Sequence, residues 1–128
     1  MSNTEIVNSI YAAFQQGDIP AILSYLAEDV VWESAGPEKI AHAGVRKGRQ
    51  NVPGFFEGLV KDHTEPELVI TDVAAQGDSV AMFGHYTATM RTTGVRLTVP
   101  IGHLWKLRDG KVVRYLGLFD SGAVLNAM

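Results

Sequence analysis

The chain has 128 residues, a length typical of one domain built around one hydrophobic core, so we expect a single domain over residues 1–128. Hydrophobic residues make up 46% of the chain and charged residues 20%, which is typical of globular proteins and argues against disorder. The formal net charge of -3 gives no electrostatic reason to expect nucleic acid or an anionic membrane as a partner, and the absence of cysteine excludes disulfides, thiolate nucleophiles and cysteine-bound metals.

The N-terminal segment carries no sign of a targeting signal. Its first residues contain no basic region followed by an apolar run, and no window of the chain approaches the roughly 20 apolar residues that a membrane span needs. We therefore expect a cytoplasmic protein with no membrane partner.

Helical spacing predicts a helix at the start of the chain. Ser2 followed three residues later by Glu5 can form a capping box, and Ile6, Ile10 and Phe14 then recur on one helical face until a Gln-Gly pair ends the pattern. We expect this face to be buried.

Two further helices are predicted before the chain changes its period. Asp18 can cap a second, shorter helix with Pro20 in its first turn. Residues 30–34 then read as a strand, and residues 35–49 as an irregular segment punctuated by glycine and proline. A third, strongly amphipathic helix follows, whose apolar positions are Val52, Phe55, Phe56, Leu59 and Val60.

Beyond Pro66 the apolar residues alternate with a period of two, which is typical of strands. We predict strands over about residues 68–75, 80–91, 95–108 and 111–119, separated by turns of which Asp109-Gly110 is well suited to a tight hairpin. Consecutive hairpins give an antiparallel meander, and the helices that precede it should cover one face. The expected fold class is therefore α+β.

Small residues interrupt the inward faces of the predicted strands. Gly84, Ala88 and Gly117 stand where large apolar side chains are expected. They either leave room for a cavity between sheet and helices or accommodate large neighbours in a solid core, and the pattern leaves both alternatives open.

A histidine lies on the buried face of the strand from residue 95. Alternate positions from Val95 to Leu107 are apolar except for His103. A neutral imidazole there can polarise a ligand carbonyl or act as an acid or base, and the alternative is a core histidine whose hydrogen bonds are satisfied by a backbone carbonyl, by Tyr86 or by Tyr115.

Other polar residues are weaker candidates. Tyr86 has the inward parity of its strand and can assist His103, whereas Glu33 has the wrong parity for a pocket. Arg46 and its basic neighbours can meet an anionic ligand or form a solvated turn. The four histidines, at positions 42, 63, 85 and 103, lack the spacing of metal ligands, so we expect no metal site.

Several features of the sequence point together to a known family. They are the order of these elements, the Gln16-Gly17-Asp18 helix end, the run Leu26 to Trp32, the glycine-flanked loop before Phe55-Phe56 and the run Trp105 to Val113. In these features the chain resembles the nuclear transport factor 2-like superfamily. Within it the chain is most similar to the SnoaL-like group, relatives of polyketide cyclases and ketosteroid isomerase. The resemblance implies a cystatin-like α+β cone, in which three N-terminal helices pack on a curved antiparallel sheet that encloses a mainly apolar pocket. Such proteins are commonly homodimers.

Carried over residue by residue, the ketosteroid isomerase site is not reproduced. By this resemblance the general base falls at Ser34, the oxyanion tyrosine at Ile10, its supporting tyrosine at Phe56 and the hydrogen-bonding aspartic acid at His103. The water-activating aspartate of related epoxide hydrolases falls near Gly117. Steroid isomerisation is therefore not expected.

The sequence thus predicts a pocket for a small, largely apolar molecule that bears a carbonyl or hydroxyl group. Either the protein is a cofactor-free isomerase or cyclase that works by proton transfer, or it is a non-catalytic ligand-binding or accessory homodimer of the same fold. The candidate catalytic residues are His103, Tyr86 and, as a second choice to its role as a helix cap, Asp120. The expected pocket wall consists of Ile10, Phe14, Trp32, Ser34, Phe55, Phe56, Met82, Val99, Ile101, Tyr115 and Phe119.

Overall fold

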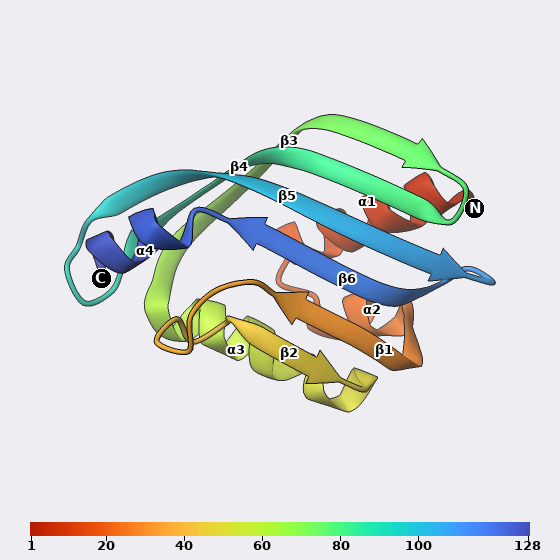
Figure 1. Cartoon of the computed structure of the whole chain (residues 1–128), viewed down its shortest axis with the longest axis horizontal. Coiled ribbons are helices and arrows are strands. Elements are labelled where there is room, and N and C mark those ends of the chain that lie inside the picture. Colours follow the sequence, from red (N-terminus) through yellow and green to blue (C-terminus); the bar gives the residue numbers. More distant parts are fainter.

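The computed structural model describes residues 1–128, and its main feature is a curved six-stranded sheet in the order β2-β1-β6-β5-β4-β3 (Figure 1). Helices from the first half of the chain pack on the concave face of this sheet. In chain order the elements are α1 (Asn3–Gln15), α2 (Ile19–Ser24), β1 (Leu26–Ser34), β2 (Gly44–Lys47), the 3-10 turn η1 (Arg49–Asn51), α3 (Pro53–Asp62), β3 (His63–Gln76), β4 (Ser79–Met90), β5 (Arg96–Arg108), β6 (Lys111–Phe119) and α4 (Ser121–Ala127).

The predicted helix starts are confirmed. The Ser2 hydroxyl accepts a hydrogen bond from the Glu5 amide at 3.1 Å, and the Glu5 carboxylate accepts one from the Ser2 amide at 3.0 Å, which completes the capping box of α1. Asp18 caps α2 by accepting from the Ala21 amide. The expected group of three N-terminal helices is found only in part. α2 has only six residues, and β1 and β2 lie between it and α3 in the chain.

The prediction of a purely antiparallel sheet is wrong at one pair of strands. β1 runs parallel to β6, whereas every other neighbouring pair is antiparallel. Alternation along a strand shows which side chains face inward but not which strand lies alongside. The parallel pairing of β1 with β6 could therefore not be predicted from it. β2 was likewise missed within the segment predicted to be irregular, because four residues next to glycine are too few to show alternation.

β3 begins at His63, five residues before the start that the alternating pattern predicted. Irregular pairing between Thr64 and Glu67 accommodates Pro66, which an edge strand tolerates because one side of its backbone has no partner. A second irregularity lies between Ile70 and Asp72, opposite Gly84. A Cβ atom at Gly84 would overlap the carbonyl oxygen of Val69, so this glycine permits a close approach of strands rather than leaving room for a cavity.

The alternation predicted for β5 is confirmed from Leu97 to Leu107, but Val95, which was also predicted to face inward, precedes the strand and is exposed. Val99, Ile101, Trp105 and Leu107 are buried on its inner face, and His103 on the same face is half-buried. The inner face packs against α1 in one apolar cluster and against α4 in a second one. None of the helices has both the length and the apolar character that crossing a bilayer requires.

Candidate ligand-binding site

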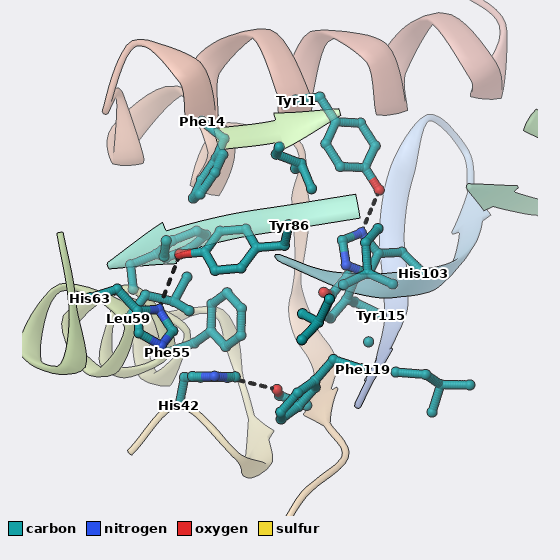
Figure 2. Close-up of a pocket in the computed structure, with 18 of the residues that line it drawn as sticks. Tyr11, Phe14, His42, Phe55, Leu59, His63, Tyr86, His103, Tyr115 and Phe119 are labelled. Atoms are coloured by element: carbon teal, nitrogen blue, oxygen red, sulfur yellow. Dashed lines mark hydrogen bonds between the residues drawn. The ribbon is translucent and has the colours of Figure 1, made fainter. Parts of the chain in front are cut away.

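A cavity of about 100 Å³ lies between the concave face of the sheet and helices α1 and α3 (Figure 2). Twenty of the 25 residues around it are hydrophobic, and none is acidic, so any polar contact to a ligand must come from its histidine, tyrosine, serine and tryptophan side chains. A mainly apolar wall with a few polar groups is the usual form of a small-molecule site.

Most of the side chains expected to form the pocket do line this cavity. They are Ile10, Phe14, Trp32, Ser34, Phe55, Phe56, Tyr86, Val99, Ile101, His103, Tyr115 and Phe119.

Two expected residues lie elsewhere. Met82 does not line the cavity, because its side chain is fully buried in the core cluster that holds α1 against the sheet. Asp120 caps α4, where its carboxylate accepts a hydrogen bond from the Ala123 amide at 3.0 Å, and it does not line the cavity either.

His103 is held by α1 and not by the partners weighed from the sequence. Its Nδ1 atom lies 2.7 Å from the hydroxyl oxygen of Tyr11, and the indole Nε1 of Trp105 donates to that same oxygen at 3.0 Å. The Tyr11 ring stacks on the imidazole, with centroids 5.9 Å apart and planes 9° apart. These contacts fix the imidazole in position and orientation.

This hydrogen-bond chain favours one of the two neutral tautomers of the imidazole. An indole nitrogen only donates, so Tyr11 accepts from Trp105 and has its own proton left to give. The one acceptor beside the Tyr11 hydroxyl is Nδ1 of His103. In the tautomer that gives the Tyr11 proton a partner, the neutral ring carries its own proton on Nε2, which has no hydrogen-bond partner within the protein.

Burial keeps these groups neutral. Desolvation lowers the pKa of His103 to about 4 and raises that of Tyr11, despite the opposing effect of the Trp105 hydrogen bond on the tyrosine. At neutral pH the site thus presents an uncharged N–H donor at Nε2 of His103.

A second group of polar side chains lines the same cavity, and the sequence analysis missed its two histidines. Nδ1 of His42 lies 3.1 Å from the Ser34 hydroxyl, and Nδ1 of His63 lies 3.1 Å from the Tyr86 hydroxyl. The two imidazole centroids are 5.7 Å apart. We call these four residues the His42–His63 group. His42 lies in a turn and His63 at the junction of α3 and β3, so neither belongs to a periodic pattern that would have revealed it.

The pKa values of the His42–His63 group also depart from their ordinary range. Desolvation, followed by the neighbouring His63, lowers the pKa of His42 to about 4, although Asp62 opposes the shift. Desolvation likewise lowers the pKa of His63 and raises that of Tyr86 to about 12. Both imidazoles are therefore neutral at pH 7.

The turn that carries His42 is held from the outside by Arg46. The guanidinium donates to the backbone carbonyls of His42, at 3.0 Å, and of Ala41, at 3.4 Å. α3 packs closely on the same turn: a Cβ atom added at Gly58 would lie only 2.8 Å from the backbone nitrogen of His42. Arg46 does not line the cavity, and its guanidinium is used to hold this turn.

We predict that acidification destabilises the protein between pH 6.5 and 5. Because the folded pKa values of His42 and His103 lie below the unfolded value of 6.5, the unfolded chain binds protons first, and stability present above pH 6.5 is lost as the pH falls. The loss should reach about 2 kcal/mol for each ring over this range. Urea unfolding at each pH measures it, and His42→Gln should show a shallower pH dependence. An unchanged slope in that variant would contradict the assignment to His42.

A curved sheet that closes over helices around a mainly apolar cavity defines a protein of the nuclear transport factor 2-like class, as the resemblance predicted. The SnoaL-like domain family matches residues 7–115, and the chain belongs to this family.

Solved structures agree with this assignment. A nuclear transport factor 2-like protein of unknown function from Burkholderia pseudomallei is 25% identical, with a TM-score of 0.90 over 99% of this chain and 98% of that chain. TerC, co-crystallised with polyporic acid, is 30% identical, with a TM-score of 0.86 over 98% and 96%. A protein from Xanthomonas campestris that is named as a candidate polyketide cyclase is 24% identical, with a TM-score of 0.82 over 98% and 95%. None of the curated protein sequences compared with this chain matches it significantly.

Proposed function

We propose that this protein binds a small, largely apolar molecule through a carbonyl or hydroxyl oxygen and converts it by cofactor-free proton transfer, as an isomerase or cyclase. The observation that carries the proposal is the orientation of His103. Tyr11 and Trp105 leave its Nε2–H as an uncharged donor on the wall of an apolar cavity. A fixed donor of this kind stabilises negative charge that develops on a substrate oxygen.

The reaction that these groups support begins with a proton on the carbon next to a carbonyl. Nε2–H of His103 donates to the carbonyl oxygen while an imidazole nitrogen of His42 or His63 removes the carbon-bound proton. The electron pair of the broken C–H bond forms an enolate. Where a carbon–carbon double bond of the substrate is conjugated with that enolate, return of the same proton to the far end of the double bond completes an isomerisation. Attack of the enolate carbon on a second carbonyl of the same molecule forms a ring instead, and the alkoxide left by the broken C=O π bond takes the proton back from the imidazolium. Tyr86 supports this step through its hydrogen bond to His63.

The comparisons support an organic ligand in this fold. TerC, which shares 30% of its sequence with this chain, was co-crystallised with polyporic acid. We take this as support for a ligand of small-molecule size, and the reaction itself rests on the side chains of this chain alone.

A non-catalytic binding role is the second candidate, and the chemistry of the wall favours it in one respect. No carboxylate lines the cavity, and an imidazole whose pKa is about 4, like that of His42, is a weak base at neutral pH. A protein that only binds and presents its ligand needs the Nε2–H donor but no base.

Two measurements on the wild-type protein separate these roles. Trp32 and Trp105 both line the cavity, so their fluorescence reports occupancy during a screen of cyclic ketones, hydroxyketones and phenols. Proton NMR in D₂O then follows hydrogen exchange at the carbon next to the carbonyl. Exchange faster than in buffer supports the enzyme, whereas binding without exchange supports the accessory role. A screen in which no compound changes the fluorescence would overturn both.

The proposal includes a homodimer that forms through the outer face of the sheet. Phe83 and Leu118 lie in register on either side of Gly102, and each is half exposed, at 50% and 51%. The next row of the same face contains Leu104 and Leu116. Such an apolar surface on the outside of a small protein is typical of an interface.

Phe83→Asp is therefore expected to convert the dimer to a monomer, because it places a charge in the centre of this apolar face. Sedimentation equilibrium measures the mass, and Val45→Asp, which changes an equally exposed valine on the edge strand β2, is the matched control. A wild-type protein that sediments as a monomer would contradict the proposed interface.

A further inference from the structure

The hydroxyl group of Tyr115 is a polar group of the cavity wall that makes no hydrogen bond within the protein. The side chain comes from β6, is only 4% exposed and lines the cavity. Trp32 Nε1 is the one fully buried side-chain nitrogen or oxygen without a partner, so the Tyr115 oxygen, which also has none, keeps contact with open space. Buried polar groups are rarely left without a partner, and here the cavity gives a ligand access to one.

The position of this hydroxyl is fixed by Gly117. A Cβ atom added at Gly117 would overlap the Tyr115 oxygen, so the oxygen occupies the place where a side chain at residue 117 would begin. The sequence left open whether this glycine makes room for a cavity or for a large neighbour. It accommodates a neighbour, and that neighbour places a hydroxyl group on the cavity wall.

This position brings the hydroxyl next to His103. Gly117 is in register with His103 on β5, and the Cβ positions of such opposed residues are about 4.5 to 5.5 Å apart. The two rings meet edge to face, with centroids 5.3 Å apart. Figure 2 shows the Tyr115 oxygen beside the imidazole, on the side away from the Tyr11 hydroxyl. The free Nε2 of His103 and the Tyr115 hydroxyl are therefore neighbours on the wall.

The Tyr115 oxygen is held in place and keeps its proton. The ring stacks on Trp32, with centroids 4.1 Å apart and planes 26° apart, and packs on Trp105 at 4.6 Å. Burial, and to a lesser extent the neighbouring Tyr11, raises the pKa of Tyr115 well above its ordinary value. At neutral pH the hydroxyl is thus an uncharged donor whose O–H bond can still rotate toward a ligand.

Two neighbouring donors favour one kind of ligand atom. A carbonyl oxygen has two lone pairs and no proton, so it can accept from Nε2–H of His103 and from the Tyr115 hydroxyl at the same time. A ligand hydroxyl that accepts both bonds has a proton of its own, for which these two groups offer no acceptor. Both bonds strengthen as negative charge develops on the oxygen, which is the change that enolate formation causes.

We infer that Tyr115 is a second hydrogen-bond donor of the site, and that its hydroxyl and Nε2–H of His103 bind the same carbonyl oxygen of the ligand. This inference rests on the proposed function, because it adds a group to the same site. It also narrows the ligand oxygen from a carbonyl or hydroxyl to a carbonyl. Tyr115 lies at none of the positions to which the ketosteroid isomerase site was carried over.

The C=O stretching frequency of a bound ketone tests this inference, because each hydrogen bond that the oxygen accepts weakens the double bond and lowers the frequency. Infrared difference spectra of cyclohexanone against its carbonyl-¹³C isotopologue isolate this band. The frequency on the wild-type protein should be lower than on Tyr115→Phe and lower than on His103→Phe. On the double variant it should approach the frequency in hexane, where the oxygen accepts no hydrogen bond.

The affinity for cyclohexanone gives a second readout. Tyr115→Phe should weaken binding about tenfold, the usual effect of losing one hydrogen bond between neutral groups, and titration followed by two-dimensional NMR measures the dissociation constant. Phenylalanine preserves the ring that stacks on Trp32. The spectrum therefore separates loss of the hydroxyl contact from a general change in packing, which would alter the affinity without raising the frequency.

Two further variants complete the test. Tyr25→Phe removes the hydroxyl of a tyrosine that does not line the cavity, so it is the matched control and should change neither the frequency nor the affinity. Gly117→Ala is the second variant if Tyr115→Phe does not fold. Its methyl group takes the place of the Tyr115 oxygen, so the frequency should rise as it does in Tyr115→Phe.

The outcomes distinguish this inference from the function on which it rests. The same C=O frequency on the wild-type protein and on Tyr115→Phe would overturn the second donor and leave the role of His103 intact. A frequency that rises in Tyr115→Phe supports the second donor even where no hydrogen exchange occurs in D₂O, in which case the protein only binds the ketone. Failure of the wild-type protein to bind cyclohexanone or any other ketone would overturn the proposed function together with this inference.

Discussion

His103→Phe is expected to lower the rate of D₂O exchange at a bound ketone by about 10²- to 10³-fold, the usual cost of removing one fixed donor to a developing oxyanion. Phenylalanine preserves the planar ring but cannot donate to the ligand oxygen. NMR exchange rates at saturating ketone measure the effect, so that weaker binding does not contribute to it. An unchanged rate in this variant would contradict the role of the Nε2–H donor.

Tyr11→Phe is the matched variant that distinguishes orientation from contact. It leaves His103 in place but removes the hydroxyl that donates to Nδ1, so the proton can occupy either nitrogen and the ring is free to turn. The exchange rate should fall between those of the wild type and His103→Phe. Thermal unfolding of the variants shows whether the loss comes from the site or from a damaged fold.

Gly84→Ala should reduce the free energy of unfolding by about 3 kcal/mol, a large effect for one added methyl group. The new Cβ atom would overlap the carbonyl oxygen of Val69, which is backbone and cannot rotate away, so β3 has to separate from β4. Urea unfolding measures the change. A stability within about 0.5 kcal/mol of the wild type would show that the irregular part of β3 adapts freely.

Gly102→Ala is the control for this substitution. The nearest atoms to a Cβ at Gly102 belong to the Phe83 side chain, at 3.1 and 3.2 Å, and this ring is half exposed and can rotate. The same added methyl group should therefore change the free energy of unfolding by less than about 1 kcal/mol. The contrast between the two glycines tests whether backbone overlap, and not loss of glycine as such, causes the damage.

Much of the fold could be predicted because its determinants are local. The capping box at Ser2 and Glu5 and the alternation through His103 each depend on residues a few positions apart. The hairpin turn likewise depends on two adjacent residues, Asp109 and Gly110, both of which adopt positive φ. Such features state which side chains face inward, and that was enough to place His103 on the cavity.

The rest of the site depends on contacts between distant segments, which no local pattern records. Tyr11 meets His103 across 92 positions, and helical spacing had favoured its neighbour Ile10 as the pocket residue. His42 and His63 reach the cavity from a turn and from the junction of two elements. Met82 shows the opposite error: its inward parity was predicted correctly, but its side chain is buried in the core and does not line the cavity.

The way in which the His42 turn is anchored has a consequence for how this scaffold can change. Arg46 and the close approach of α3 hold the turn, whereas His103 depends on α1 and β5. The two halves of the recognition surface therefore have separate supports. Grafting a different short segment between β1 and β2 alters what one half recognises without disturbing the other, which makes this loop the natural place to diversify or to engineer new selectivity.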